Sequence, residues 1–206
     1  MKIASIVEGH GEAIALPILL RRLGEWLTPE IFVDVLTPIR VHRNRFIHRE
    51  EEFQRHLQLA AAKCGENGWI LVLLDADDDC PAELGASLLN RARVQVPHRR
   101  LSVVFAKREY ESWFIAAAES LDGHRGFTIQ PGDSTEAETP RNAKGWIKSR
   151  MADRSYGETT DQPGFSARMD LSLAGARSRS FRKLVTEWQR NAPVGVDSPP
   201  SPFSIP

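Results

Sequence analysis

The sequence predicts an α/β protein in which a parallel sheet of about four strands has helices on both faces and is followed by a C-terminal helical extension. Three observations predict it. Short apolar runs rich in strand-forming residues alternate with longer segments whose leucines and alanines recur at helical spacing. This alternation continues to about residue 121, and the last third of the chain is more polar and less regular. Alternating strands and helices imply right-handed crossovers and therefore a parallel sheet.

The first half of the chain contains two strand-then-helix units. Ile3 to Val7 is almost wholly apolar and predicts the first strand, and Ala13 to Leu27 carries leucines at helical spacing. A glycine-containing turn separates the two segments. Ile31 to Val41 predicts a second strand, and Glu50 to Lys63 reads as an amphipathic helix.

The next two units complete the predicted sheet. Trp69 to Leu74 is the most hydrophobic run of the chain, and its lack of alternation indicates a central strand covered on both faces. Pro81 suits the first turn of the following helix. Leu101 to Ala106 supplies a fourth strand, and Tyr110 to Leu121 predicts another helix.

The regular pattern suggests three regions. Residues 1–121 form the predicted α/β core, and residues 122–191 form a helical and loop extension that packs on it. Helices are predicted within this extension near residues 140–151 and 178–190. Residues 192–206 are rich in proline and are expected to be disordered.

Composition narrows the class of protein. The 206 residues include 27 basic and 27 acidic side chains, and this zero net charge removes the simplest electrostatic argument for nucleic-acid binding. Neither a signal-peptide pattern nor a membrane-length apolar run is visible. Cys64 and Cys80 are too few for a disulfide framework or a zinc cluster. We therefore expect a cytoplasmic protein without membrane contact.

Acidic residues follow two of the predicted strands. Glu8 comes just after the first strand, and Asp75 and Asp77 lie at and just after the third. The carboxyl ends of parallel strands meet at one edge of a sheet, where ligand sites gather. Oxygen-rich sites of this kind suit Mg²⁺ or Mn²⁺, which are the predicted cofactors. Glu12 lies one helical turn after Glu8 and could reach a second metal ion.

Each acidic residue also has a structural explanation. Glu12 could simply complement the positive end of the first helix, and Asp78 or Asp79 could cap the helix that begins near Pro81. Asp75 is harder to explain this way, because an acid that closes a long apolar run is costly to desolvate.

A dinucleotide-binding turn is a rival interpretation of Gly9-His10-Gly11. The third glycine of that motif would fall on Ile14, which is too large for close helix–strand packing, and Glu8 would repel a pyrophosphate.

The motif Glu8-Gly9-x-x-Glu12, followed later by Asp75-x-Asp77-x-Asp79, resembles the Toprim signature of topoisomerases, bacterial primases, recombination mediator proteins and OLD-family nucleases. The later segment Glu109-Tyr110-Glu111-Ser112-Trp113-Phe114 makes the resemblance more specific. With it, the chain is similar to an uncharacterised bacterial Toprim-like family, the domain of unknown function 4276 family. The similarity covers most of the chain and includes Ser180-Phe181.

This resemblance implies a Toprim-like, Rossmann-like core related to the Toprim domains of OLD-family nucleases. It implies that Glu8 acts in acid–base chemistry or metal binding, and that Asp75 and Asp77 hold magnesium. Asp79 and Glu111 are further candidate metal ligands. The chain lacks a nucleotide-binding P-loop, so an OLD-like ATPase would have to be a separate partner protein.

The leading hypothesis is a metal-dependent phosphodiester hydrolase that acts on nucleic acid. Lys107 is its candidate charge-stabilising catalytic residue. A basic run supplies candidate phosphate contacts, namely Arg40, Arg43 and Arg45. Two alternatives stay open: a non-catalytic partner of a separate ATPase in a defence or repair system, and a metal-dependent nucleotide-processing enzyme.

Overall fold

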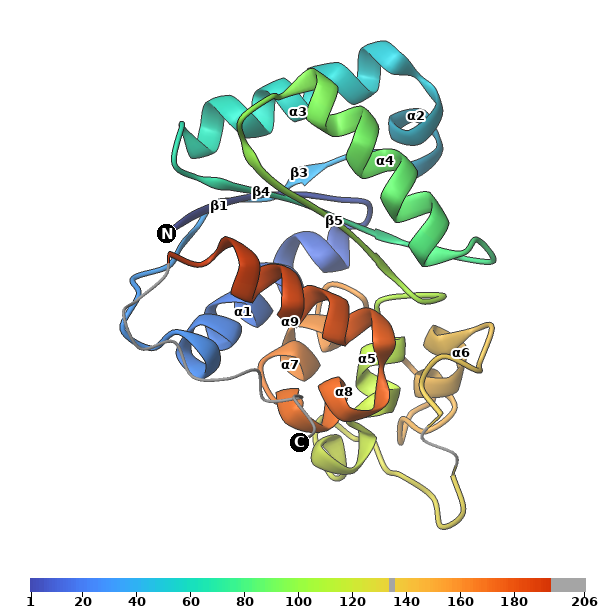
Figure 1. The fold of residues 1–206 in the computed structure, drawn as a ribbon. Helices are drawn as coiled ribbons and strands as arrows, with labels where there is room; N and C mark the ends of the chain where they lie inside the picture. The colour runs from blue at the N-terminus through green and yellow to red at the C-terminus, as the bar shows by residue number, and fades with distance from the viewer. Residues whose placement is uncertain (134–135, 194–206) are drawn as a thin grey trace.

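A computed structural model describes residues 1–133 and 136–193 of the chain (Figure 1). The predicted proline-rich tail lies outside these residues from position 194 onward. Among the helices described, none is both long enough and apolar enough to cross a membrane.

The described residues contain a parallel sheet, as the sequence predicts. Strand β1 pairs with β4, and β4 pairs with β5, so that the order across the sheet is β2-β1-β4-β5, with β3 also pairing with β1. The strands are β1 (Lys2–Val7), β2 (Asp34–Val35), β3 (Ile39–Arg40), β4 (Trp69–Asp75) and β5 (Arg100–Ala106).

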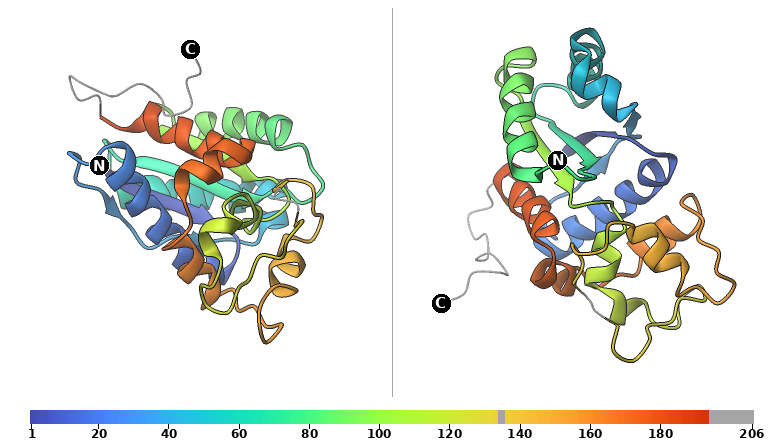
Figure 2. Two further views of the ribbon diagram at one scale, coloured as in Figure 1. Left: turned by 90° about the horizontal axis from the view of Figure 1, so that it is seen from below. Right: turned by 90° about the vertical axis from the view of Figure 1, so that its right-hand side faces the viewer.

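Helices cover both faces of this sheet (Figures 1 and 2). One face carries α2 (Arg43–His48), α3 (Glu50–Cys64) and α4 (Pro81–Gln95). The other face carries α1 (His10–Leu27) and α9 (Arg179–Asn191). The remaining helices lie beyond the carboxyl end of β5 and are α5 (Ser112–Ala116), the 3₁₀ helix η1 (Ala118–Leu121), α6 (Ala143–Lys148), α7 (Asp161–Ser166) and α8 (Leu171–Arg177).

The central position of β4 explains its continuous apolar sequence. Alternate side chains of a strand point to opposite faces. Trp69, Leu71 and Leu73 pack in the hydrophobic cluster on the side of α1 and α9, and Ile70 and Val72 pack in the cluster on the side of α3 and α4. Because both faces are covered, neither set of positions can be polar.

The predicted strand at residues 31–41 is wrong as a single element. The segment forms two short strands, β2 and β3. Asp34 of β2 pairs with Lys2, and Ile39 of β3 pairs with Ile6. The segment therefore has one more residue between these two pairings than β1 has. Pro38 lies in the gap and has no N–H to donate to a sheet. The segment therefore leaves β1 and returns in a shifted register.

Two further differences concern helices. The predicted helix at residues 110–121 begins only at Ser112, after the N–H of Tyr110 has been bound by the Asp75 carboxylate. It is divided into α5 and η1 at Ala117, which has a non-helical φ of −111° and ψ of 21°. Helices α2, α7 and α8 have six or seven residues each and were not predicted. So few residues cannot display a clear helical periodicity.

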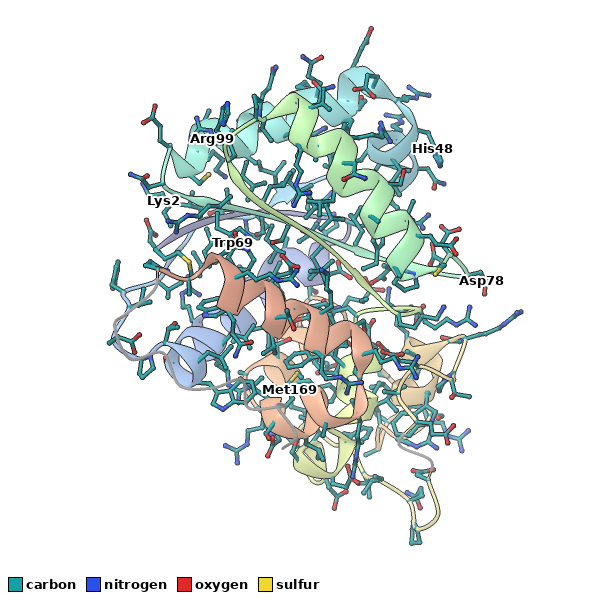
Figure 3. The ribbon with its side chains drawn as sticks, in the orientation of Figure 1. Lys2, His48, Trp69, Asp78, Arg99 and Met169 are labelled. Atoms are coloured by element: carbon teal, nitrogen blue, oxygen red, sulfur yellow. The ribbon has the colours of Figure 1, made fainter. Side chains whose placement is uncertain are left out.

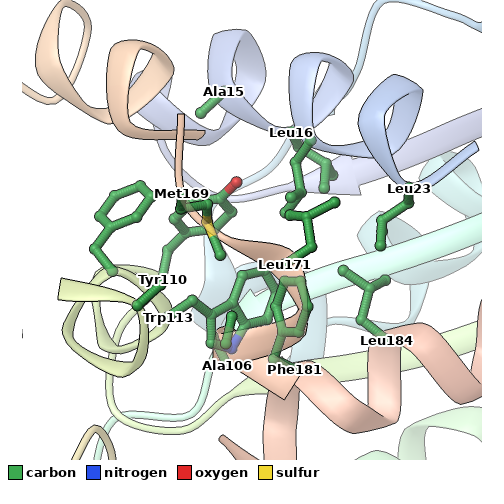
Figure 4. Close-up of a cluster of buried hydrophobic side chains, with 14 of the residues drawn as sticks. Ala15, Leu16, Leu23, Ala106, Tyr110, Trp113, Met169, Leu171, Phe181 and Leu184 are labelled. Carbon is green, nitrogen blue, oxygen red and sulfur yellow. The ribbon is translucent and has the colours of Figure 1, made fainter. Parts of the chain in front are cut away.

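The extension shares its core with the sheet. Its buried side chains belong to the same hydrophobic cluster as α1 and β4, and include Phe127, Ile147, Phe165, Met169, Phe181, Leu184 and Trp188. Figure 4 shows part of this cluster, with Phe181 of α9 beside Trp113 and Leu184 of α9 facing Leu23 of α1. The rings of Trp69 and Trp188 meet edge to face with centroids 5.8 Å apart, an arrangement that contributes about 0.5–1.5 kcal/mol beyond area burial.

Candidate active site

The candidate active site lies at the carboxyl edge of the sheet, where β1, β4 and β5 end. Asp75 and Ala106 are paired at the ends of β4 and β5, and the loops that follow remain connected. The N–H of Asp77 donates to the carbonyl of Arg108 at 3.0 Å. Both residues adopt left-handed backbone conformations, with φ of 48° and 65°. Non-glycine residues seldom adopt this conformation, and it concentrates at functional sites.

Asp75 is fixed at the centre of this edge. One carboxylate oxygen, Oδ1, accepts a hydrogen bond from the backbone N–H of Tyr110 at 2.9 Å. Desolvation raises the pKa of Asp75 well above its usual range, and the carboxylates of Glu12, Glu111 and Glu8 raise it further. The acidic residues after β1, β4 and β5 therefore form one interacting cluster, in which negative charge is unfavourable unless a proton or a cation compensates it.

Glu12 and Glu111 form the buried part of this cluster. Their exposed fractions are 6% and 0%. The side-chain amide of Gln162 donates to both carboxylates, at 3.5 Å to Glu12 and 3.2 Å to Glu111. The other oxygen of each carboxylate, Oε2, is buried without a hydrogen-bond partner, as is Oε1 of Gln162. Orphaned buried acceptors are rare in folded proteins and indicate a missing proton, water or ion.

The burial of Glu111 has a large effect on its protonation. Desolvation raises the pKa of Glu111 to about 7, although Lys144 and a 3.0 Å hydrogen bond from the Tyr156 hydroxyl oppose the shift. Glu111 is thus not an ordinary ion-paired carboxylate. The adjacent Tyr110, Trp113 and Phe114 are fully buried core residues.

Lys144 brings a positive charge to the acidic cluster from α6. Partial burial lowers its pKa, but Glu111, Glu158 and Asp75 together raise it above the usual value. Its ammonium group also lies 3.1 Å from a carboxylate oxygen of Glu158. Lys144 therefore stays charged beside the cluster.

Glu8 lies at the more open side of the site. It is partly buried, and desolvation raises its pKa from the usual value, while Asp77 and Glu12 raise it further. Arg43 and His42 act in the opposite direction. Glu8 thus interacts with both the buried cluster and the exposed loop after β4.

Arg43 connects α2 to the loop after β4. The guanidinium is buried, and its Nε donates to the carbonyl of Asp75 at 2.9 Å. Its Nη2 binds the carboxylate of Asp79 at 2.6 Å, and its Nη1 lies 3.6 Å from that of Asp77. The phosphate-contact role of Arg43 stays a prediction, because most of its donors already bind this loop.

The capping interpretation of Asp78 and Asp79 is wrong. The N-cap of α4 is Cys80, and no side chain caps this helix. Asp78 instead pairs with Arg108, and Asp79 with Arg43. Figure 3 shows Asp78 at the outer end of the loop between β4 and α4.

The other predicted basic residues lie on the elements and loops next to these strand ends. The guanidinium of Arg40 lies 2.6 Å from the ring of His10, and Arg45 is exposed on α2. Lys107 follows β5, and its Nζ lies 3.4 Å from the carbonyl oxygen of Asp79.

Within residues 1–133 and 136–193, no three or more His, Cys, Asp or Glu side chains are arranged so that they could hold a metal ion. Glu8, Glu12, Asp75 and Glu111 interact electrostatically, but they do not surround a common position as they stand. Asp77 interacts with Glu8 and Arg43 at the exposed side of the site.

A family model described as "Domain of unknown function (DUF4276)" matches residues 7–188. The chain belongs to this family. The matched region of the DUF4276 chain runs from the end of β1 into α9, so it includes both the acidic cluster and the extension. No curated protein and no solved structure matches the chain.

Sequence reasoning missed the part of the DUF4276 site that comes from the extension. Lys144, Tyr156 and Gln162 all contact or interact with Glu111, yet they lie 33 to 51 residues after it in a segment of weak pattern. No motif links them to the acidic residues. Only the closeness of α7 to α1 brings Gln162 to Glu12.

Proposed function

We propose that this protein is a divalent-metal-dependent phosphodiester hydrolase that acts on nucleic acid and is related to Toprim nucleases. The observation that carries the proposal is the interacting cluster of Glu8, Glu12, Asp75 and Glu111 at the carboxyl edge of the sheet. Acidic residues from three strand ends have no structural need to gather in a desolvated position, since each raises the pKa of the others. A bound cation would neutralise these carboxylates and would explain why they lie close together.

The donor atoms of this cluster are of the kind that Mg²⁺ or Mn²⁺ prefers. All are oxygen atoms, and Oε2 of Glu12 and of Glu111 are buried without a partner. Because the described carboxylates do not surround a common position as they stand, a bound ion would have to draw Glu12, Asp75 and Glu111 together, with Glu8 and Asp77 at the open side. When bound, the metal would supply charge neutralisation at the phosphate and activation of a water molecule.

The residues of the chain itself would carry two further tasks. Glu8 has a partly exposed carboxyl group with a raised pKa, which suits proton transfer to or from the substrate at its carboxylate oxygens. Lys144 keeps its charge beside Asp75 and Glu111 and would stabilise negative charge on the reacting phosphate. Lys144 is therefore a second candidate charge-stabilising residue, in addition to Lys107.

A cleavage assay tests the proposal directly. Plasmid DNA, single-stranded DNA and RNA are incubated with the full chain in Mg²⁺, in Mn²⁺ and in EDTA. We expect cleavage that needs the metal and that falls by more than about 100-fold in Asp75→Asn and Glu8→Gln. Asp78→Asn is the matched control, because Asp78 is exposed and pairs with Arg108, and it keeps most of the activity.

Each outcome of this assay is informative. Cleavage that persists in Asp75→Asn or in EDTA would refute the proposed site. Binding of nucleic acid without cleavage of any substrate in either metal would favour a non-catalytic partner of a separate ATPase.

A further inference from the structure

A cavity of about 760 Å³ lies beside the candidate active site. It is bounded by the first half of α4, the second half of β5 and the start of α9, and Figure 1 shows α4 and α9 beginning on opposite sides of the end of β5. Asp78, Asp79 and Lys107 line the cavity and also belong to the loops that carry the site. A volume of this size is typical of a pocket for one small organic ligand.

The floor of the cavity is apolar. Val103 and Phe105 of β5 line it with exposed fractions of only 4% and 2%, and Leu89 and Pro81 of α4 add further apolar surface. Ala86 lies on the exposed side of α4 and also lines the cavity. The flat face of a nucleobase could lie against these side chains.

The uncompensated charge of the cavity is positive. Within the described parts of the chain, Lys107 and Arg179 line it without a carboxylate ion-pair partner. Of the other charged lining residues, Asp78 pairs with Arg108, Asp79 with Arg43 and Lys183 with Glu187. The Glu138 carboxylate accepts a hydrogen bond from the N–H of Ser180 but has no cationic partner among the described residues, so the two unpaired cations exceed the unpaired anions by one charge.

We propose that this cavity binds one nucleoside phosphate unit, with the base on the apolar floor and the phosphate beside Lys107 and Arg179. The first turn of α4 borders the cavity, and its N-cap residue Cys80 makes no side-chain capping hydrogen bond. The inference deepens the proposed nuclease function, because a strand held here would carry its next phosphodiester toward the acidic cluster. The volume admits one unstacked nucleotide and not a base-paired duplex.

Binding measured without metal tests this inference separately from cleavage. The probe is a single-stranded DNA hexamer with a 3′ fluorophore, followed by fluorescence anisotropy with the full chain in EDTA. Deoxyadenosine monophosphate, deoxyadenosine and inorganic phosphate are added as competitors. We expect the monophosphate to compete at least about tenfold more strongly than either part alone, since both the base and the phosphate are bound. If deoxyadenosine monophosphate binds as tightly as the hexamer, the ligand of the cavity is a free nucleotide. If it binds much more weakly than the hexamer, the ligand is a nucleotide within a single strand.

Three variants locate the binding. Arg179→Ala and the cavity-filling Ala86→Trp should each weaken binding by about tenfold with an unchanged melting temperature. Arg93→Ala is the matched control at the far end of α4 and should bind like wild type. A wild-type protein that binds in this cavity but never cleaves would refute only the nuclease proposal. Equal competition by inorganic phosphate, or unchanged binding in folded Arg179→Ala and Ala86→Trp, would overturn the nucleotide site.

Discussion

Glu111→Gln is the most discriminating test of the acidic cluster, because it removes one charge while keeping the shape of the side chain. Glu111 is fully buried, and its pKa is raised from 4.5 to about 7. The folded protein therefore binds the Glu111 proton more tightly than the unfolded chain does. The stability associated with this proton is fully present below pH 4.5 and is lost as pH rises through 7.

The magnitude follows from the shift of the pKa. A rise in pKa from 4.5 to about 7 corresponds to an upper limit of about 3 kcal/mol at pH 8. Gln keeps an oxygen that can accept from Tyr156 and Gln162, so the variant should keep these hydrogen bonds. We expect Glu111→Gln to differ least from wild type at pH 5 and to be more stable at pH 8 by up to about 3 kcal/mol, or roughly 6–12 °C in Tm.

The measurement is urea unfolding in EDTA at half-unit steps from pH 5 to pH 8. Glu51→Gln, at an exposed position of α3, is the control and should show a pH-independent difference from wild type. A difference between Glu111→Gln and wild type that stays constant across this range would refute the assigned burial and charge coupling. Saturating Mn²⁺ at about 100 times its Kd should stabilise wild type by about 2.7 kcal/mol and Glu111→Gln by much less, if the cluster holds the ion.

Two pairs of substitutions test the packing around the site. An added Cβ at Gly11 would lie 2.0 Å from Gln162 Oε1, so Gly11→Ala should lower the free energy of unfolding by about 1–3 kcal/mol in thermal melts. The added Cβ of Gly85→Ala meets only ordinary van der Waals contacts, so this variant should be more stable than wild type by about 0.5–1 kcal/mol. Arg43→Met should lower the free energy of unfolding in urea by about 1–3 kcal/mol, because two main-chain carbonyl groups lose their hydrogen-bond donor. Asp79→Asn should lower it by less than about 1 kcal/mol, because the Asp79 carboxylate is exposed. Equal melting of the two glycine variants, or a larger effect of Asp79→Asn than of Arg43→Met, would contradict these contacts.

The sequence by itself determined the sheet and the end of each long strand. The apolar runs before Glu8 and Asp75 could only be buried strands, and the parallel arrangement follows from the helices between them. The placement of Glu8 and Asp75 at the same edge of the sheet was therefore predictable from residue spacing, whereas the pairing of β1 with β4, which makes their loops neighbours, comes from the structure. Helix α3 buries Phe53 and Leu57, as its periodicity required.

Only the tertiary structure decided which side chains join this acidic edge. Gln162 lies 150 residues after Glu12 and contacts it because α7 packs beside α1, and Lys144 comes from a helix of only six residues. Likewise, the binding of Asp79 to Arg43 depends on where α2 lies, and not on the position of Asp79 before α4. Local sequence patterns indicate which residues are buried and which segments form strands or helices. Contacts between distant segments depend on how the surfaces of those segments pack, and a local pattern contains no information about this packing.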